Sequence, residues 1–409
     1  MSVLLIGTLD TKGTEFAYVR DQLLAAGVPV TVMDVGVLAP PAFVPDIPRE
    51  RVFAASGANY ALVKAAGDRG KAVSLAAEGA TKLAAELHRA GKISGVMSLG
   101  GSAGTTIGTA AMRAVPVGVP KLMVSTLASG QVQHYVGTRD VMMMYSVVDI
   151  AGLNRISRVV LDNAVAAMAG MVRAGAEPKS PVPGSDKPVI AATMFGVTTP
   201  CVEAARSQLE TAGYEVLVFH ATGTGGRTME GLIRDGLIAG VLDITTTELA
   251  DELVGGILSA GRDRLTAASL KGVPQIISVG ALDMVNFGPR ETVPSKCKDR
   301  RFHEHNSTVT LMRTTPEEMD RLGQEIANKA SAASGPTAVM LPLRGVSAID
   351  AGGESFWWPE ADAALFQSVR NWMAPDVEVI ELDLHINDPA FAAACAGKLL
   401  DLMKRSAIK

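Results

Sequence analysis

Two loops rich in glycine and hydroxyl side chains carry the residue types that bind phosphate groups. The first, 7–13 (GTLDTKG), directly follows the apolar run 2–6, and the second, 100–106 (GGSAGTT), directly follows the apolar run 93–99. Each pattern predicts a buried parallel strand that ends in a loop and leads into a helix, and open α/β sheets bind ligands at such strand ends. Glycines let backbone N–H groups approach phosphate oxygens, and the helix N-terminus favours negative charge. The loops therefore predict a site for a nucleotide or another phosphorylated ligand.

Neither loop matches a standard nucleotide-binding fingerprint. The P-loop requires a lysine directly before Ser or Thr, which Thr105 and Thr106 lack, and Gly7 lacks the partner glycines of the dinucleotide pattern. The alternative is that both loops are tight strand-to-helix turns without a ligand. In the first loop, Lys12 could neutralise a phosphate and Asp10 could hold a magnesium-bound water. Alternatively, Asp10 caps the next helix and Lys12 is solvated.

Two further positions extend this candidate site. Asp34 ends the second predicted strand, where an acidic residue can bind a ribose hydroxyl or simply form a turn. Ser125 ends the predicted strand 121–125 and could line the same pocket. The predicted nucleotide-contacting residues are Thr8, Asp10, Thr11, Lys12, Asp34, Gly100, Gly101, Ser102, Gly104, Thr105, Thr106 and Ser125.

The C-terminal half holds the more reactive side chains. His303 and His305 are two residues apart, so in an extended segment both would point to the same side. They are a candidate metal pair, a source of one acid–base histidine, or two histidines that only hydrogen-bond a loop. The third metal ligand would come from Asp283, Asp350 or Glu354.

Cationic residues in the same half could hold an acidic substrate. Arg301, Arg313 and Arg344 are candidates for clamping a carboxylate or phosphate, although each could equally form a surface ion pair. The loop 223–228 (GTGGRT) follows a predicted strand and is the second half's own candidate anion-binding loop. The predicted catalytic residues are His303, His305, Asp283 and Arg344.

Strands of four to eight residues alternate with helical patterns along the whole chain, which indicates βαβ units and parallel sheets. The segment 175–186 is rich in proline and predicts a linker. The pattern then restarts, because residues 21–32 align with residues 207–218 at an offset of 186 (residue 207 minus residue 21). We therefore predict two Rossmann-like α/β domains with mainly parallel sheets facing across a cleft, spanning 1–180 and 187–409.

Composition narrows the class of protein. The 409 residues are 48% hydrophobic and 4% aromatic, with a net charge of −4 and no basic run, which argues against nucleic-acid binding. Three widely separated cysteines form no metal or disulfide pattern, as in a reducing cytosol. No signal peptide is apparent, and no apolar run approaches the roughly 18 residues of a membrane span. The prediction is a cytoplasmic protein without a membrane partner.

Several longer strings resemble a known family. They include the loops at 7–13 and 100–106, MFGVTTPC at 194–201, GALDMVNFG at 280–288 and FHEHN at 302–306. They are similar to the Tm-one-like ATP-binding domain family, and the similarity covers essentially the whole chain. The resemblance implies two α/β domains, ATP bound with Mg²⁺ in the N-terminal half, and a homodimer, but it implies no reaction.

The second loop departs from the family's usual GGSGG pattern, because Ala103 takes the fourth place. If that position needed a positive φ, alanine would cost up to about 1 kcal/mol there.

These observations support one leading function and an alternative. The first is an ATP- and Mg²⁺-binding enzyme that acts on an organic acid or sugar-derived small molecule by phosphoryl or acyl transfer. The alternative is a nucleotide-binding regulatory or protein-interaction module that performs no chemistry. An oxidoreductase with a dinucleotide cofactor is the weakest interpretation, because the glycine fingerprint fails. Turnover of ATP with a metabolite pool would separate the first two.

Overall fold

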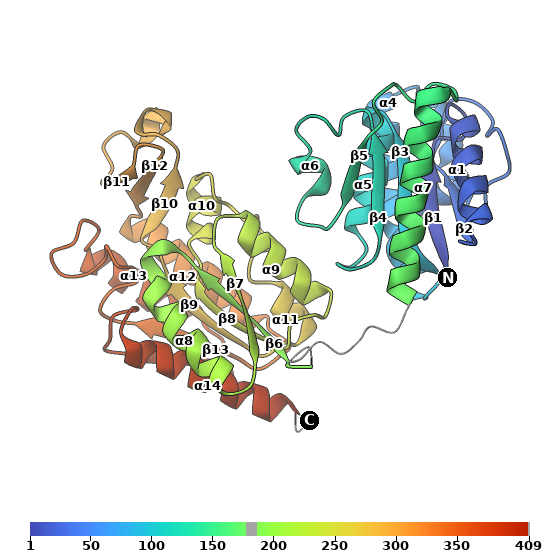
Figure 1. The fold of residues 1–409 in the computed structure, drawn as a ribbon. Coiled ribbons are helices and arrows are strands. Elements are labelled where there is room, and N and C mark those ends of the chain that lie inside the picture. The colour runs from blue at the N-terminus through green and yellow to red at the C-terminus, as the bar shows by residue number, and fades with distance from the viewer. Residues whose placement is uncertain (177–185, 408–409) are drawn as a thin grey trace. The chain divides into compact units, whose positions relative to one another are not determined.

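The computed structural model describes residues 1–176 and 186–407. The chain divides into two compact units, Met1–Pro181 and Val182–Lys409, which we call the N-domain and the C-domain (Figure 1). Most of the linker predicted at 175–186 lies outside the described residues; its first two residues end a helix.

The N-domain is built on a five-stranded parallel sheet in the order β2-β1-β3-β4-β5. The chain runs from β1 outward to β2 and then crosses back to β3 on the other side of β1. The gap between β1 and β3 is therefore the topological switch point, where ligands bind in such sheets. In chain order its elements are β1 (Ser2–Gly7), α1 (Gly13–Ala25), β2 (Val30–Asp34), α2 (Arg49–Ala55), α3 (Tyr60–Ala66), α4 (Arg69–Arg89), β3 (Ile93–Gly100), α5 (Ser102–Arg113), β4 (Lys121–Ser125), α6 (Gln133–Val136), β5 (Met142–Tyr145) and α7 (Arg155–Ala176).

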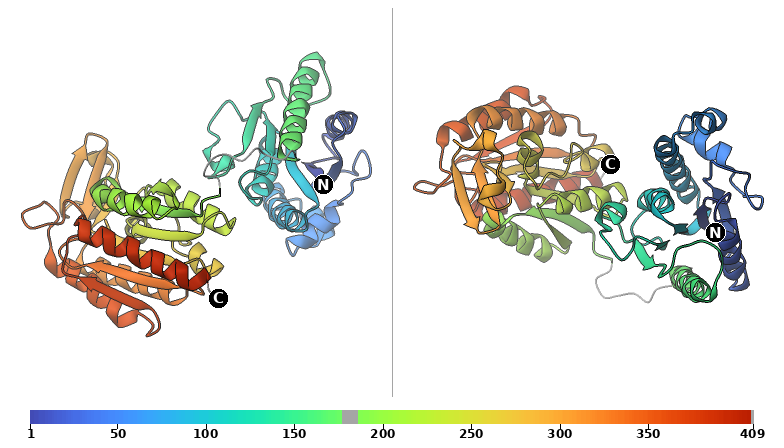
Figure 2. Two further views of the ribbon diagram at one scale, coloured as in Figure 1. Left: turned by 60° about the horizontal axis from the view of Figure 1, so that its bottom comes forward. Right: turned by 90° about the horizontal axis from the view of Figure 1, so that it is seen from above.

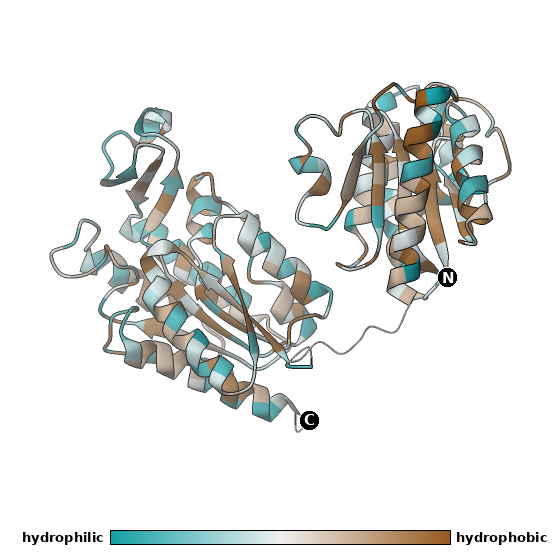
Figure 3. Ribbon diagram, in the orientation of Figure 1, coloured by the Kyte–Doolittle hydropathy of each residue, from teal (hydrophilic) through white to brown (hydrophobic). Residues whose placement is uncertain are grey.

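Both faces of this sheet are buried, because successive side chains of a strand point to opposite sides. In β1, Leu4 and Ile6 pack on the face covered by α2, α4 and α5, while Val3 and Leu5 pack on the face covered by α1 and α7. The view from above in Figure 2 shows the sheet between these two layers of helices. Hydrophobic residues accordingly concentrate along the strands and the inner helix faces (Figure 3). Such a two-sided core fixes the strand ends that carry the predicted loops.

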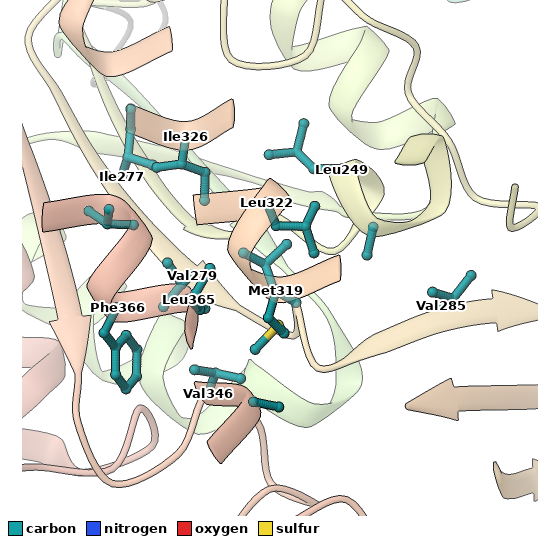
Figure 4. Close-up of a cluster of buried hydrophobic side chains, with 14 of the residues drawn as sticks. Leu249, Ile277, Val279, Val285, Met319, Leu322, Ile326, Val346, Leu365 and Phe366 are labelled. Carbon is teal, nitrogen blue, oxygen red and sulfur yellow. The ribbon is translucent and has the colours of Figure 1, made fainter. Parts of the chain in front are cut away.

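The C-domain repeats this plan around a six-stranded parallel sheet, β14-β13-β9-β8-β6-β7, and adds a three-stranded antiparallel sheet, β10-β12-β11. The helices α12 and α13 pack on one face of the main sheet, where Ile277, Val279, Leu322 and Phe366 share one cluster (Figure 4). Its elements are β6 (Val189–Met194), η1 (Gly196–Thr198), α8 (Thr199–Thr211), β7 (Glu215–His220), α9 (Thr224–Arg234), β8 (Gly240–Thr245), α10 (Glu248–Val254), α11 (Ala267–Lys271), β9 (Gln275–Gly280), β10 (Met284–Phe287), η2 (Arg290–Thr292), η3 (Ser295–Cys297), β11 (Phe302–Asn306), β12 (Val309–Arg313), α12 (Pro316–Ser331), β13 (Thr337–Pro342), α13 (Pro359–Trp372), β14 (Glu378–Leu382) and α14 (Pro389–Ala407).

The predicted internal repeat corresponds to equivalent structure in the two domains. Helix α8, 199–211, begins and ends 186 residues after α1, 13–25 (199 minus 13 and 211 minus 25). The strand order β7-β6-β8 in the C-domain also repeats the order β2-β1-β3 in the N-domain. The prediction of two Rossmann-like domains with mainly parallel sheets is therefore confirmed.

One helix corrects a sequence-based expectation. Helix α7 is long and apolar enough to cross a membrane by length and composition, whereas we predicted from the sequence that no apolar run approaches that length. Its valines, one isoleucine and one leucine, together with many alanines and two methionines, give it this hydropathy. Leu161, Val165 and Met168 pack into the N-domain core, which is how a covering helix of a globular domain behaves.

Candidate functional site

A pocket of about 400 Å³ opens at the switch point of the N-domain, where the loops after β1 and β3 meet. The loops supply polar groups, and the segments after β2 and along α3 and α4 supply a mostly apolar wall. The lining residues are Thr8, Asp10, Thr11, Val35, Val37, Leu38, Val63, Lys64, Gly67, Asp68, Arg69, Ala72, Val73, Ala76, Gly101, Ser102, Ala103, Gly104 and Ile107. The two predicted loops therefore do come together at one cavity.

The first turn of α5 faces this pocket. Gly101 is the N-cap residue, and no side chain caps the helix. The N–H groups of Ser102, Ala103 and Gly104 have no carbonyl partner within the helix, because the helix begins there. A helix start of this kind favours an anionic ligand through its N–H groups and its dipole.

The glycines of the second loop provide space rather than unusual backbone angles. A Cβ on Gly104 would lie 3.2 Å from the carbonyl oxygen of Leu99, so this glycine lets α5 pack closely on β3. A Cβ on Gly101 would have no neighbour nearer than Oγ1 of Thr126 at 3.7 Å. Ala103 belongs to α5 and has no positive φ. Alanine at position 103 therefore causes none of the backbone strain that a positive φ would bring.

Asp10 supplies a carboxylate at the pocket wall. Its side chain is 1% exposed, and its Oδ2 accepts the backbone N–H of Leu38 at 2.7 Å. Its Oδ1 is buried and has no hydrogen-bond partner, and the Cα of Gly36 packs against it. Asp10 does not cap α1, which has Lys12 as its N-cap residue. One carboxylate oxygen of Asp10 is thus buried without a hydrogen-bond partner among the described residues.

Asp34 lies behind the pocket and holds the loops around it. Its Oδ1 accepts the N–H groups of Leu9 at 3.2 Å and Gly36 at 3.0 Å, and its Oδ2 accepts from Arg49 Nε at 2.6 Å. Arg49 is 3% exposed, and its Nη1 lies 3.8 Å from Asp10 Oδ2. Arg49 was not a candidate from the sequence, because one arginine after Pro48 carries no distinctive signal. The buried ion pair of Asp34 and Arg49 therefore holds together the chain segments that follow β1 and β2.

The remaining predicted nucleotide contacts do not line the pocket. Lys12 donates through Nζ to the carbonyl oxygen of Ile150. Thr105 and Ser125 are buried, with their hydroxyl oxygens 2.7 Å apart. Thr106 is half-buried on α5 and donates to the carbonyl oxygen of Ser102 at 2.9 Å. In this conformation these side chains stabilise the loops.

The corresponding loops of the C-domain are filled by the protein's own side chains. At its switch point, between β6 and β8, the hydroxyl oxygens of Thr198 and Thr245 are 2.8 Å apart. The predicted anion loop at 223–228 is also occupied, since Glu248 Oε1 accepts the N–H of Gly223 at 2.7 Å and that of Gly226 at 3.1 Å. Arg264, completely buried, binds the other oxygen of this carboxylate at 2.6 Å. Loop 223–228 therefore already has an internal anion.

The four predicted catalytic residues occupy different surroundings. His303, on β11, is 3.1 Å from Ser355 Oγ through Nδ1, while His305 is exposed beside a register shift in the β11–β12 pairing. Arg344 is exposed and binds both carboxylate oxygens of Asp383, at 2.6 and 2.7 Å. Among the residues that the structure describes, no three His, Cys, Asp or Glu side chains form a metal-holding group.

Asp283 belongs to a buried charge cluster with Asp350, Asp362 and Arg313. Nη2 of Arg313 is 2.7 Å from Asp362 Oδ1 and 3.5 Å from Asp350 Oδ1. Asp283 accepts the hydroxyl of Ser347 at 2.7 Å, and its other oxygen is buried without a partner. Burial, with Asp350 adding to it and Arg313 opposing it, raises the pKa of Asp283 to about 7 and that of Asp362 to about 8. Asp362 was not predicted from the sequence, because the sequence shows it only as one of two acidic residues in the first turn of α13.

A second cavity, of about 600 Å³, lies at the carboxyl ends of β13 and β14. Arg344, His385 and Asp362 line it, whereas Asp283, His303 and His305 do not. His385 cannot act as a free acid or base there. Its Nε2 is 2.9 Å from the carbonyl oxygen of Ser347 and must donate, while its Nδ1 accepts the N–H of Asn387 at 3.1 Å.

Comparisons with known proteins match both domains. Residues 1–177 match the N-terminal domain, and residues 187–403 the C-terminal domain, described as "Uncharacterised protein family (UPF0261)". A UPF0261 protein of Clostridium tetani is 50% identical over 404 residues, covering 98% of this chain and 99% of that protein.

Two tomato (Solanum lycopersicum) proteins are also similar. The ToMV resistance protein Tm-1(GCR237) is 48% identical over 317 residues, covering 77% of this chain and 42% of that protein. The ToMV susceptible protein tm-1(GCR26) is 40% identical over 422 residues, covering 99% of this chain and 56% of that protein. The chain spans about half the length of these two tomato proteins.

Proposed function

The chain belongs to the uncharacterised protein family UPF0261, and we propose that its N-domain binds ATP with Mg²⁺ in the pocket between β1 and β3. The single observation that carries this proposal is the uncapped start of α5 opening into a cavity at the switch point. The resemblance to the Tm-one-like ATP-binding domain family, supported by the tomato relatives, indicates the particular nucleotide.

The phosphate groups would lie against the second loop. The N–H groups from Ser102 to Gly104 are the donors, and the bare Cα of Gly101 lets a phosphate approach them. Thr8 and Thr11, on the first loop, add hydroxyls to the same pocket. Backbone donors at a helix start suit a phosphate chain because they hold negative charge without a lysine.

The apolar wall suits the nucleoside. Val35, Val37 and Leu38 line the pocket from the segment after β2, and Val63 and Val73 line it from α3 and α4. A cavity of about 400 Å³ with an apolar wall and a few polar groups has the usual form of a small-ligand site. A flat base can bury its faces there while its phosphates reach α5.

Asp10 fits a role in holding magnesium. Its Oδ1 is buried without a partner at the pocket wall, and Mg²⁺ commonly binds proteins through one or two carboxylates while keeping several waters. Bound there, Mg²⁺ would neutralise phosphate charge. Asp34 and Arg49 would keep Asp10 in place, because they join the loops on either side of it.

Two uses of the bound nucleotide follow. Phosphoryl or acyl transfer to an organic acid or a sugar-derived small molecule would make the protein an enzyme. A non-catalytic nucleotide-binding module is favoured by another observation: Arg344 lines the cavity at the carboxyl ends of β13 and β14, whereas the other three predicted catalytic residues do not.

Isothermal titration of the full chain with ATP and Mg²⁺ tests the proposal. We expect micromolar binding that Gly101→Val abolishes, because the new side chain would enter the pocket without meeting close neighbours. The matched control is Thr106→Val, at a half-buried residue of the same helix that does not line the pocket, which should change the affinity by less than about twofold. Absence of binding to the native chain, or equal binding to Gly101→Val, would overturn the proposal.

A turnover assay then separates the two uses. ADP release that depends on adding pooled organic acids or sugar derivatives would identify an enzyme. Tight binding with no release under any pool would identify the module.

A further inference from the structure

A separate cavity in the C-domain carries an inference that does not rest on nucleotide binding. It lies at the carboxyl ends of β13 and β14, with Trp357 and Phe366 among its apolar walls and Asp362 as its buried acid. We propose that this cavity binds a small organic amine, whose ammonium group pairs with the carboxylate of Asp362.

The first observation is that buried carboxyl groups outnumber the cations beside them. Asp283, Asp350 and Asp362 are 0%, 0% and 6% exposed, and Arg313 is the one guanidinium among them. Oδ1 of Asp350 is buried without a hydrogen bond and faces the same Nη2 of Arg313 that binds Asp362. Buried charges are costly unless they are paired. A cation beside Asp362 would give this cluster a second positive charge.

The second observation is that Asp362 has an oxygen available on the cavity side. Its Oδ1 is occupied by Arg313 at 2.7 Å, but no described residue donates to its Oδ2. The side chain lines the cavity and is 8% exposed. A ligand can therefore reach this carboxylate without displacing Arg313.

The other charged groups of the cavity are already paired, which argues against an anionic ligand. Arg344 binds Asp383 through two hydrogen bonds, and Arg370 pairs with Glu381. His385 uses both ring nitrogens within the chain. Asp362 is the acid that lines the cavity, and an ammonium group on an apolar body would pair with its ionised form.

Ligand-observed NMR on the full chain tests the proposal with two matched pairs of probes. These are 2-phenylethylamine with 2-phenylethanol, and n-butylamine with n-butanol. We expect the amines to bind and the alcohols to bind at least about tenfold more weakly, because a hydrogen bond to an ionised group is the stronger one. Equal binding of an alcohol and its amine, or no binding of either amine, would overturn the proposal.

The variant Asp362→Asn should weaken amine binding by about tenfold or more while still accepting from Arg313. Glu360→Gln is the matched control, since it removes an exposed acid from the same first turn of α13 without touching the cavity. Amine binding that survives Asp362→Asn unchanged would overturn the proposal.

If Asp362→Asn fails to fold, the affinity for the amine can be measured on the native chain over a series of pH values. Asp362 faces Asp350, Asp283 and Arg313, and its pKa is raised to about 8 by burial and then by Asp350. The amine needs the ionised carboxylate, so its affinity should rise as pH increases from about 6 to about 8. An affinity that is flat or falls across this range would exclude Asp362 as the partner.

Discussion

The Glu248 carboxylate accepts the backbone N–H of Gly223 at 2.7 Å, at the loop where the sequence predicted an anion-binding site. Glu248 also accepts from Gly226 and from the completely buried Arg264, so loop, acid and guanidinium form one unit. The sequence pattern was that of an anion-binding loop, but the anion is part of the chain. At the start of α5 in the N-domain, by contrast, no side chain of the described residues caps the helix.

Replacing Glu248 tests this relationship. Glu248→Gln would leave Arg264 with one fewer charged partner and the start of α9 without its anion. We expect the free energy of unfolding of the C-domain to fall by about 3 kcal/mol. Urea unfolding followed by circular dichroism measures it. Glu210→Gln, at an exposed ion pair with Arg206, should change it by less than about 1 kcal/mol.

We expect the Asp10 side chain to contribute more to magnesium binding than to the stability of the fold. Asp10→Asn keeps an acceptor for the N–H of Leu38 and removes the charge of the unpartnered oxygen. We expect unfolding free energy to change by no more than about 1 kcal/mol, while the gain in ATP affinity on adding Mg²⁺ disappears. Titrations with and without Mg²⁺ measure that gain, and an undiminished gain in the variant would count against Asp10.

Ala103 offers a direct check of the loop conformation. Because Ala103 lies in the first turn of α5 without a positive φ, glycine there would add only backbone freedom. We expect Ala103→Gly to lower the unfolding free energy of the N-domain by about 0.5–1 kcal/mol and to leave ATP affinity unchanged. An increase in stability would mean that alanine is strained at this position.

Buried acids predict how C-domain stability depends on pH. Burial is the main cause that raises the pKa of Asp251 and of Asp283 to about 7, and of Asp362 to about 8. These groups keep their protons in the folded state at pH values where the unfolded chain has lost them. The unfolding free energy should therefore fall as pH rises from about 5 to about 8, by on the order of 3 kcal/mol for each of these groups.

Urea unfolding across that range measures this trend. In Asp362→Asn the slope should be shallower, because one of the groups no longer titrates. Stability that increases with pH over the same range would contradict the raised pKa values.

Much of the fold follows from local patterns in the sequence. The apolar runs at 2–6 and 93–99 became β1 and β3, and the repeat at an offset of 186 marked the equivalent helices α1 and α8. The edge strand β5 was missed, because Met142–Tyr145 is short and has partly exposed side chains on an edge rather than a buried run. The pattern of apolar residues that predicts a strand depends on burial of its side chains, so this signal is weakest in a partly exposed edge strand.

The candidate site was only partly predictable for a different reason. Glycine and hydroxyl residues after a strand mark a loop, so Thr8, Asp10 and Gly101 were found and do line the pocket. The partners that fix such a site come from distant segments, as Arg49 does for Asp34, and spacing gives no sign of them. Asp362 illustrates the same limit, since only the fold places it beside Arg313.

The matching strand orders and helix bounds of the two domains have an evolutionary consequence. A common offset of 186 and the same β2-β1-β3 arrangement are what duplication of one ancestral domain would leave behind. At that offset Asp10 corresponds to Gly196 and Asp34 to His220, so the acids around the N-domain pocket have no acidic counterparts in the other copy. Two copies of one ancestral domain would therefore have diverged at the switch point. The N-domain has a pocket there, whereas in the C-domain the hydroxyl oxygens of Thr198 and Thr245 lie 2.8 Å apart.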